Sequence, residues 1–128
     1  MLEQELSNRV INCFYRVYNC LGHGFLEKVY ENALALELNK RGMNAKQQQR
    51  VDVYYDGSQV GQYFADIIVN DVVILELKAA ETLAPEHEAQ LINYLKATEI
   101  ELGFLLNFGP KPQFLRRILT NDKKELHL

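Results

Sequence analysis

The spacing of apolar residues in the first third of the chain predicts two amphipathic helices. In residues 6–21 apolar side chains recur every three or four positions, and the segment Gly22–Gly24 then interrupts the pattern. The same period resumes after these glycines and continues to Gly42, a residue type that commonly ends helices. Two helices are therefore expected before any strand.

From residue 50 the pattern changes to runs of β-branched and aromatic residues, which are typical of strands. The turn dipeptides Asp56-Gly57 and Asn70-Asp71 divide this region into segments. Three antiparallel strands follow from this arrangement.

The helical period returns from Pro85 to about Thr98, and an apolar strand pattern follows over residues 101–108. Because that strand comes after a helical crossover, it is expected to lie parallel to its neighbour. Residues 114–119 suggest a short terminal helix. The predicted order is α-α-β-β-β-α-β-α, which indicates one α/β domain over residues 1–128 with a mixed four-stranded central sheet flanked by helices.

Composition and charge narrow the classes of protein. A chain of 128 residues with 48% hydrophobic content fits one core. The apolar runs are too short to span a membrane and the start does not resemble a secretory signal, so we expect a cytoplasmic protein. A net charge of −3 and a pI of 5.6 argue against a protein that coats DNA by its overall charge. These values leave room for local clusters of basic residues on the surface.

Ionisable residues stand where the strand pattern is most apolar. Around Glu76 and Lys78, side chains on both faces of the predicted strand are apolar, which is typical of a central strand covered on both sides. Charged groups there lose solvation unless they pair, bind a metal or face a cleft. The alternative is that the strand emerges into solvent, which leaves a surface pair worth at most about 1 kcal/mol.

Asp66, in the preceding strand, favours the interpretation in which Glu76 and Lys78 lie in a partly buried site. Opposed residues of a hairpin share a face, and their numbers have a constant sum. With a two-residue turn at Asn70-Asp71, the numbers of paired residues sum to 141, and Asp66 and Glu76 point to opposite faces. Asp66 lies directly opposite Glu76 only if the numbers of paired residues sum to 142. We therefore predict a loop with an odd number of residues, such as Asn70–Val72, or a bulge near Asp66.

Two carboxylates that meet in a partly dry pocket repel each other, and a shared proton or a divalent cation relieves the repulsion. A hard cation such as Mg²⁺ prefers oxygen ligands and keeps several waters, one of which can act as a nucleophile. Lys78 lies on the same face as Glu76 and could hold that water or stabilise charge on a phosphoryl oxygen.

This ordered set of residues resembles a known superfamily. Asp66, the triplet Glu76-Leu77-Lys78 and an acid on a preceding helix resemble the PD-(D/E)XK nucleases. Gly24, Glu27 and Tyr30 are similar to the motif of the GxxExxY family within that superfamily, as is the later sequence QLINYL. The resemblance covers roughly residues 10–118 and implies a restriction-endonuclease-like core.

The resemblance also implies roles for individual residues. Asp66, Glu76 and the backbone carbonyl of Leu77 would be ligands of Mg²⁺ or Mn²⁺, and Lys78 would be the catalytic amine. Glu27 would be the helical acid that completes the metal shell, although a glutamate in the first turn of a helix also favours the helix dipole. Gln90 would orient a water or a phosphate, although it fits a surface amide equally well.

The function expected from these residues is a metal-dependent nuclease that hydrolyses phosphodiester bonds of nucleic acid, with DNA as the expected form. Cleavage of both strands would suggest a homodimer, because so small a domain has one site. The alternative is a binding or regulatory module that keeps the nuclease fold with a structural or vestigial metal site.

Overall fold

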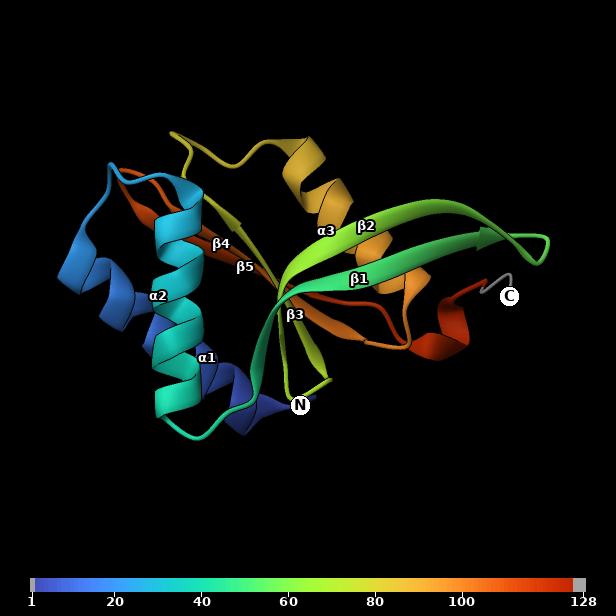
Figure 1. Cartoon of the computed structure of the whole chain (residues 1–128), viewed down its shortest axis with the longest axis horizontal. Helices are drawn as coiled ribbons and strands as arrows, with labels where there is room; N and C mark the ends of the chain where they lie inside the picture. The colour runs from blue at the N-terminus through green and yellow to red at the C-terminus, as the bar shows by residue number, and fades with distance from the viewer. Residues whose placement is uncertain (1, 126–128) are drawn as a thin grey trace.

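A mixed β-sheet with helices on both faces forms the structure, a computed structural model that describes residues 2–125 (Figure 1). The helices are α1 (Gln4–Leu21), α2 (Glu27–Lys40) and α3 (Pro85–Ala97), with a 3₁₀ turn at Asn121–Lys123. The strands are β1 (Ala45–Tyr55), β2 (Ser58–Val69), β3 (Val73–Lys78), β4 (Leu102–Phe108) and β5 (Pro112–Ile118). None of the described helices has the length and apolar content needed to cross a membrane.

In the described residues the sheet has five strands in the order β1-β2-β3-β4-β5. The β3–β4 pair is parallel and the other pairs are antiparallel, as expected for a helical crossover through α3. Strands β3 and β4 are almost fully buried, which confirms the central position expected for the strand that carries Glu76.

The predicted terminal helix over residues 114–119 is wrong, and the prediction of four strands is wrong with it. This segment forms β5, which pairs along β4 from Leu102↔Ile118 to Phe108↔Pro112. Without it, the backbone groups of β4 on that side would lack ladder partners, and buried β4 cannot satisfy them with water. The sheet edge therefore determines the conformation of the segment.

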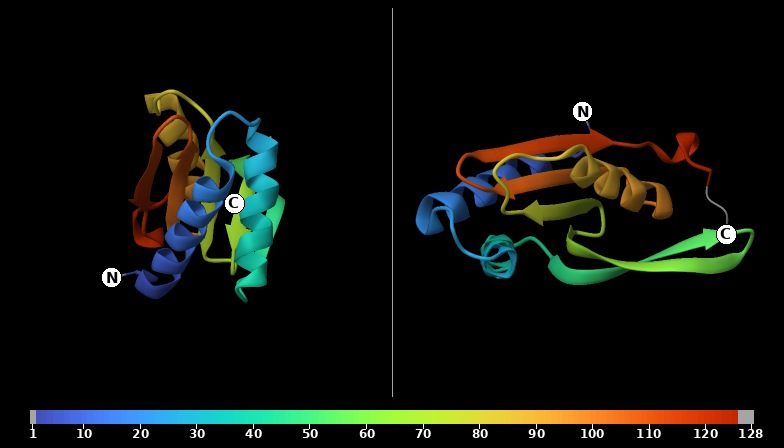
Figure 2. Two further views of the ribbon diagram at one scale, coloured as in Figure 1. Left: turned by 90° about the vertical axis from the view of Figure 1, so that its left-hand side faces the viewer. Right: turned by 90° about the horizontal axis from the view of Figure 1, so that it is seen from above.

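Two apolar clusters fix the layers. Helices α1 and α2 pack on one face of the sheet, around Phe14, Tyr30 and Phe108. Helix α3 covers the other face, where Leu91 packs against Gly103 of β4 so closely that a Cβ at Gly103 would stand 2.6 Å from the Leu91 side chain. The long β1–β2 hairpin extends beyond the rest of the sheet, alongside α3 (Figures 1 and 2).

Candidate active site

The hairpin between β2 and β3 brings Asp66 and Glu76 together. The ladder pairs Ile67↔Leu75 and Val69↔Val73, so the residue numbers sum to 142 and the loop spans three residues, 70–72. This register confirms the predicted odd loop. Asp66 and Glu76 are the next pair of opposed residues after Ile67↔Leu75, and their side chains lie on the same face of the sheet.

The two carboxylates replace ladder bonds at this position. The backbone N–H of Asp66 donates to Oε2 of Glu76 at 2.7 Å, and the backbone N–H of Leu77 donates to Oδ2 of Asp66 at 2.8 Å. Each carboxylate thus accepts a hydrogen bond from the opposite strand. We call this arrangement of Asp66, Glu76 and the Leu77 backbone the carboxylate fork.

Burial raises the pKa of both acids. Glu76 is only 2% exposed, and its burial, followed by the charge of Asp66, raises its pKa from 4.5 to about 8. The pKa of Asp66 is also raised, mainly by burial and further by the charges of Glu31 and Glu27, against the opposing effect of the Leu77 N–H. Without a cation, the fork therefore holds a proton near neutral pH.

Lys78 lies beside the fork at the end of β3. It is half-buried, it shares a face with Glu76, and its charge lowers the pKa of both Asp66 and Glu76. Its partner in β4 is Asn107, a fully buried residue whose side chain both donates to and accepts from the backbone of Ala80 at 2.9 Å. These two bonds fix the path of the chain just after Lys78.

Glu31 is a site residue for which the sequence predicted no role. It is 4% exposed, and its carboxylate accepts hydrogen bonds from Lys28 at 3.0 Å, Gln47 at 2.7 Å and Gln48 at 2.9 Å. Its charge raises the pKa of Asp66 and of Glu76, so it lies within electrostatic range of the fork. Its position one helical turn after Glu27 is the sequence signal that could have identified it.

The contact with Glu31 depends on an unusual backbone conformation. Neighbouring residues of a regular strand point to opposite faces, yet Gln47 and Gln48 both reach Glu31. Gln48 has φ of 52°, a left-handed value that costs a non-glycine residue about 1–3 kcal/mol and is often found at functional sites. It stands in β1 between the pairs Gln47↔Ile67 and Gln49↔Ala65, opposite Asp66.

Glu27 begins α2 and is exposed to solvent. Its charge raises the pKa of Asp66, so the structure brings it within electrostatic range of the fork, although farther into solvent than Glu31. Tyr30, the last residue of the Gly-Glu-Tyr motif, has a structural position. Its hydroxyl donates to the carbonyl of Gly22 at 2.6 Å and accepts from the N–H of Phe25 at 3.1 Å, which ties down the turn before α2.

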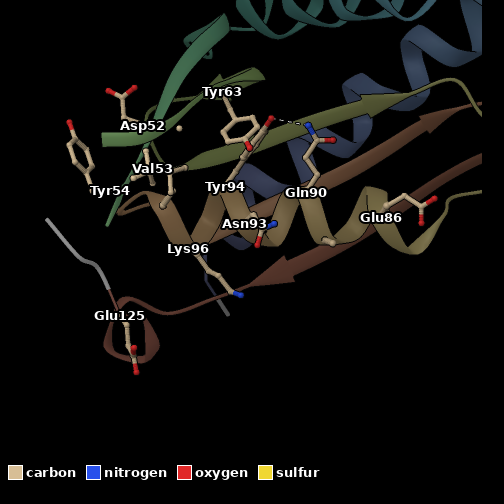
Figure 3. Close-up of a pocket in the computed structure, with 14 residues that line it drawn as sticks. Asp52, Val53, Tyr54, Tyr63, Glu86, Gln90, Asn93, Tyr94, Lys96 and Glu125 are labelled. Carbon is tan, nitrogen blue, oxygen red and sulfur yellow. Dashed lines mark hydrogen bonds between the residues drawn. The ribbon is translucent and has the colours of Figure 1, made fainter. Parts of the chain in front are cut away.

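Gln90 lies on α3, which packs on the opposite side of the sheet from α2. Its side-chain amide donates to the hydroxyl of Tyr94 at 2.8 Å (Figure 3). Burial raises the pKa of Tyr94, and the charges of Glu76 and Asp66 raise it further. Tyr94 therefore lies within electrostatic range of the fork, and Gln90 is joined to it by the hydrogen bond.

The fork has the chemistry of a site for a hard cation. Each backbone hydrogen bond uses one carboxylate oxygen, so the second oxygen of Asp66 and of Glu76 can serve as a ligand, as can the carbonyl of Leu77. Within residues 2–125, no three His, Cys, Asp or Glu side chains already converge as a metal site. A cation would therefore require the acids of α2 or water to complete its shell.

Comparisons with known proteins identify a superfamily and a similar fold. The family model described as the PD-(D/E)XK nuclease superfamily matches residues 4–118. The crystal structure of SSO0001 aligns with a TM-score of 0.59 at 19% sequence identity, which shows a shared fold; the alignment covers 76% of this chain and 52% of SSO0001. This chain thus spans about half the length of that protein. No curated protein is significantly similar to the chain.

Proposed function

The chain belongs to the PD-(D/E)XK nuclease superfamily, and from this premise we propose that it is a metal-dependent nuclease that hydrolyses phosphodiester bonds of nucleic acid, with DNA as the expected substrate. The observation that carries the proposal is the carboxylate fork. Buried Glu76 and half-buried Asp66 on adjacent strands face one another beside Lys78, and the fold retains them despite the cost of removing them from water.

Oxygen atoms of Asp66, Glu76 and the Leu77 backbone would hold a divalent cation such as Mg²⁺ or Mn²⁺. The bound ion supplies an activated water and charge neutralisation for phosphodiester hydrolysis. Glu27 and Glu31, one turn apart on α2, are the candidate helical acids that complete the site. The motif of the GxxExxY family, which the chain resembles, favours Glu27, whereas burial and the three hydrogen bonds to its carboxylate favour Glu31.

Lys78 and Gln90 would act on the reacting groups. The ammonium of Lys78 would position the attacking water or offset the negative charge that develops on the phosphate. The side-chain amide of Gln90 would orient a water or a phosphate oxygen from the α3 side. Cleavage of both strands of a duplex would require two copies of the chain, and a homodimer is the arrangement that we propose for that case.

One observation favours the alternative of a binding or regulatory module. Both acids of the fork already accept backbone hydrogen bonds from the opposite strand, so the arrangement also works as a structural device that closes the β2–β3 hairpin. The pI of 5.6 points the same way, because a nucleic-acid-binding surface usually has a basic excess.

Cleavage assays distinguish the two candidates. Purified wild type and Glu76→Ala are incubated with single-stranded, duplex and branched DNA and with RNA, in Mg²⁺ or Mn²⁺. Glu5→Ala, a change at an exposed glutamate on α1, is the control. We expect cleavage by wild type and the control and its loss in Glu76→Ala. Equal cleavage by all three proteins, or none by any of them although they fold, would favour the non-catalytic module.

A further inference from the structure

A groove of about 610 Å³ runs between the β1–β2 hairpin and α3 (Figure 3). Its lining includes three tyrosines, Tyr54 and Tyr63 from the hairpin and Tyr94 from α3, together with the amide side chains of Gln90 and Asn93. The proposed metal chemistry does not require such a groove.

The tyrosine rings offer flat surfaces to a ligand. Tyr63 and Tyr94 lie with their ring centroids 5.8 Å apart and their planes at 47°. Tyr63 remains 51% exposed and Tyr54 40% exposed, so both rings retain area that a flat ligand could cover. Exposed aromatic rings of this kind are the platforms on which proteins stack the bases of single strands.

The charges of the groove argue against a phosphate or a simple cation as its occupant. The carboxylate of Asp52 is held by Arg50 at 2.7 Å, and Glu86, Glu125 and Lys96 bring charges of both signs to the wall. The described lining therefore contains neither a cluster of cations for phosphate nor a set of unpaired carboxylates for a cation. Aromatic faces and amides suit a neutral, planar ligand with hydrogen-bonding edges, which describes a nucleobase.

The groove approaches the candidate active site at Tyr94. Gln90 and Tyr94 line it and are joined by their 2.8 Å hydrogen bond, and Tyr94 lies within electrostatic range of Asp66 and Glu76. A strand whose phosphate lies at the fork can therefore place a neighbouring base against the tyrosines. A base that is paired in a duplex has its hydrogen-bonding edge occupied and cannot enter.

We propose that this groove binds an unpaired nucleobase next to the scissile phosphate, so that the protein prefers single-stranded or locally unpaired nucleic acid. The inference rests on the proposed nuclease function, because the position of the phosphate comes from that function. The inference adds to the proposed nuclease function the class of substrate on which the protein acts.

Binding measurements with Ca²⁺ in place of Mg²⁺ test the groove without relying on cleavage. The probes are a labelled oligothymidine strand, the same strand with abasic sites, and a duplex of equal length. The proteins are wild type, Tyr63→Ala, Tyr63→Phe and the control Tyr55→Ala, which changes a 64% exposed tyrosine of β1 outside the groove lining. Since the chain has no tryptophan, its emission comes from seven tyrosines, and quenching that is present in wild type and lost in Tyr63→Ala reports stacking on Tyr63.

We expect wild type to bind the base-containing strand about tenfold more tightly than the abasic strand, and Tyr63→Ala to lose about the same factor. Tyr63→Phe, which keeps the ring, and Tyr55→Ala should bind as wild type does. The inference is overturned if wild type binds the strand and its abasic form equally, prefers the duplex, binds no strand, or is matched in affinity by Tyr63→Ala.

Cleavage assays on the same proteins separate this inference from the proposed function. Cleavage that requires Glu76 but is unaffected in Tyr63→Ala on a single strand would keep the nuclease and remove the base-binding groove. Base-dependent binding through Tyr63 without cleavage of any substrate would keep the groove and remove the nuclease.

Discussion

Asp66 and Glu76 are joined across two strands by reciprocal contacts, because each carboxylate accepts a backbone hydrogen bond from the strand of the other. This relationship both closes the β2–β3 hairpin and holds a buried acid, Glu76, beside a half-buried one, Asp66. The same geometry thus sets the stability of the metal-free protein and its capacity to hold a cation.

The first prediction concerns the stability of the metal-free protein as a function of pH. The folded pKa of Glu76, about 8, lies above its usual 4.5, so the folded state binds more protons than the unfolded state between these values. The stabilising contribution is full below about pH 4.5 and is lost as the pH rises through about 8. The raised pKa of Asp66 acts in the same direction.

Glu76→Gln removes this titration. In EDTA, we expect the free energy of unfolding of the variant to exceed that of wild type by a margin that grows between pH 5 and pH 9, to about 3 kcal/mol. Urea titrations at several pH values measure it, with Glu5→Gln as the control. A margin that stays constant or shrinks over this range would contradict the burial of an uncompensated acid.

The second prediction decides between the two acids of α2. Glu31→Gln should lower Mn²⁺ affinity and cleavage by about 10- to 100-fold, as expected for a buried group that supports a metal site. Glu27→Gln should have a smaller effect, because its side chain is exposed and solvent screens its charge. The two variants are compared by metal titration and by initial rates. A larger loss in Glu27→Gln would identify Glu27 as the helical acid.

The third prediction concerns Tyr30. Tyr30→Phe keeps the stacking on Phe108, whose ring centroid lies 4.5 Å away, but removes the bonds to Gly22 and Phe25. We expect a loss of about 1–3 kcal/mol in the free energy of unfolding, since the partners are partly buried, with cleavage per folded molecule unchanged. Tyr15→Phe on α1 is the control. Unchanged stability with lost cleavage would instead give the hydroxyl a chemical role.

Local pattern and hairpin geometry predicted much of the fold and the position of the fork. If Asp66 and Glu76 share a face, the numbers of paired residues in the β2–β3 hairpin must sum to 142, and the observed register has that sum. The segment around Phe114 misled because Phe114, Leu115, Ile118 and Leu119 also have helical spacing. Only the open edge of β4, a tertiary feature, selects the strand.

The surroundings of the fork could not be predicted in the same way. The role of Glu31 depends on two glutamines that reach it only because Gln48 adopts a left-handed φ of 52°. Glutamine has no preference for that conformation, so nothing in the local sequence signals it. The tyrosine groove likewise arises from the packing of α3 against a distant hairpin.

The most direct test of the account is calorimetric titration of the metal-free protein with Mn²⁺ at pH 7, in two buffers of different ionisation enthalpy. Binding of Mn²⁺ to wild type should be saturable. Because Glu76 has a pKa of about 8 without metal, its carboxyl is protonated at pH 7, and binding of the cation should release about one proton. Glu76→Gln should lose both the affinity and the proton release. The absence of saturable binding to wild type, or equal binding and proton release by the variant, would contradict the claim that the carboxylate fork holds a cation.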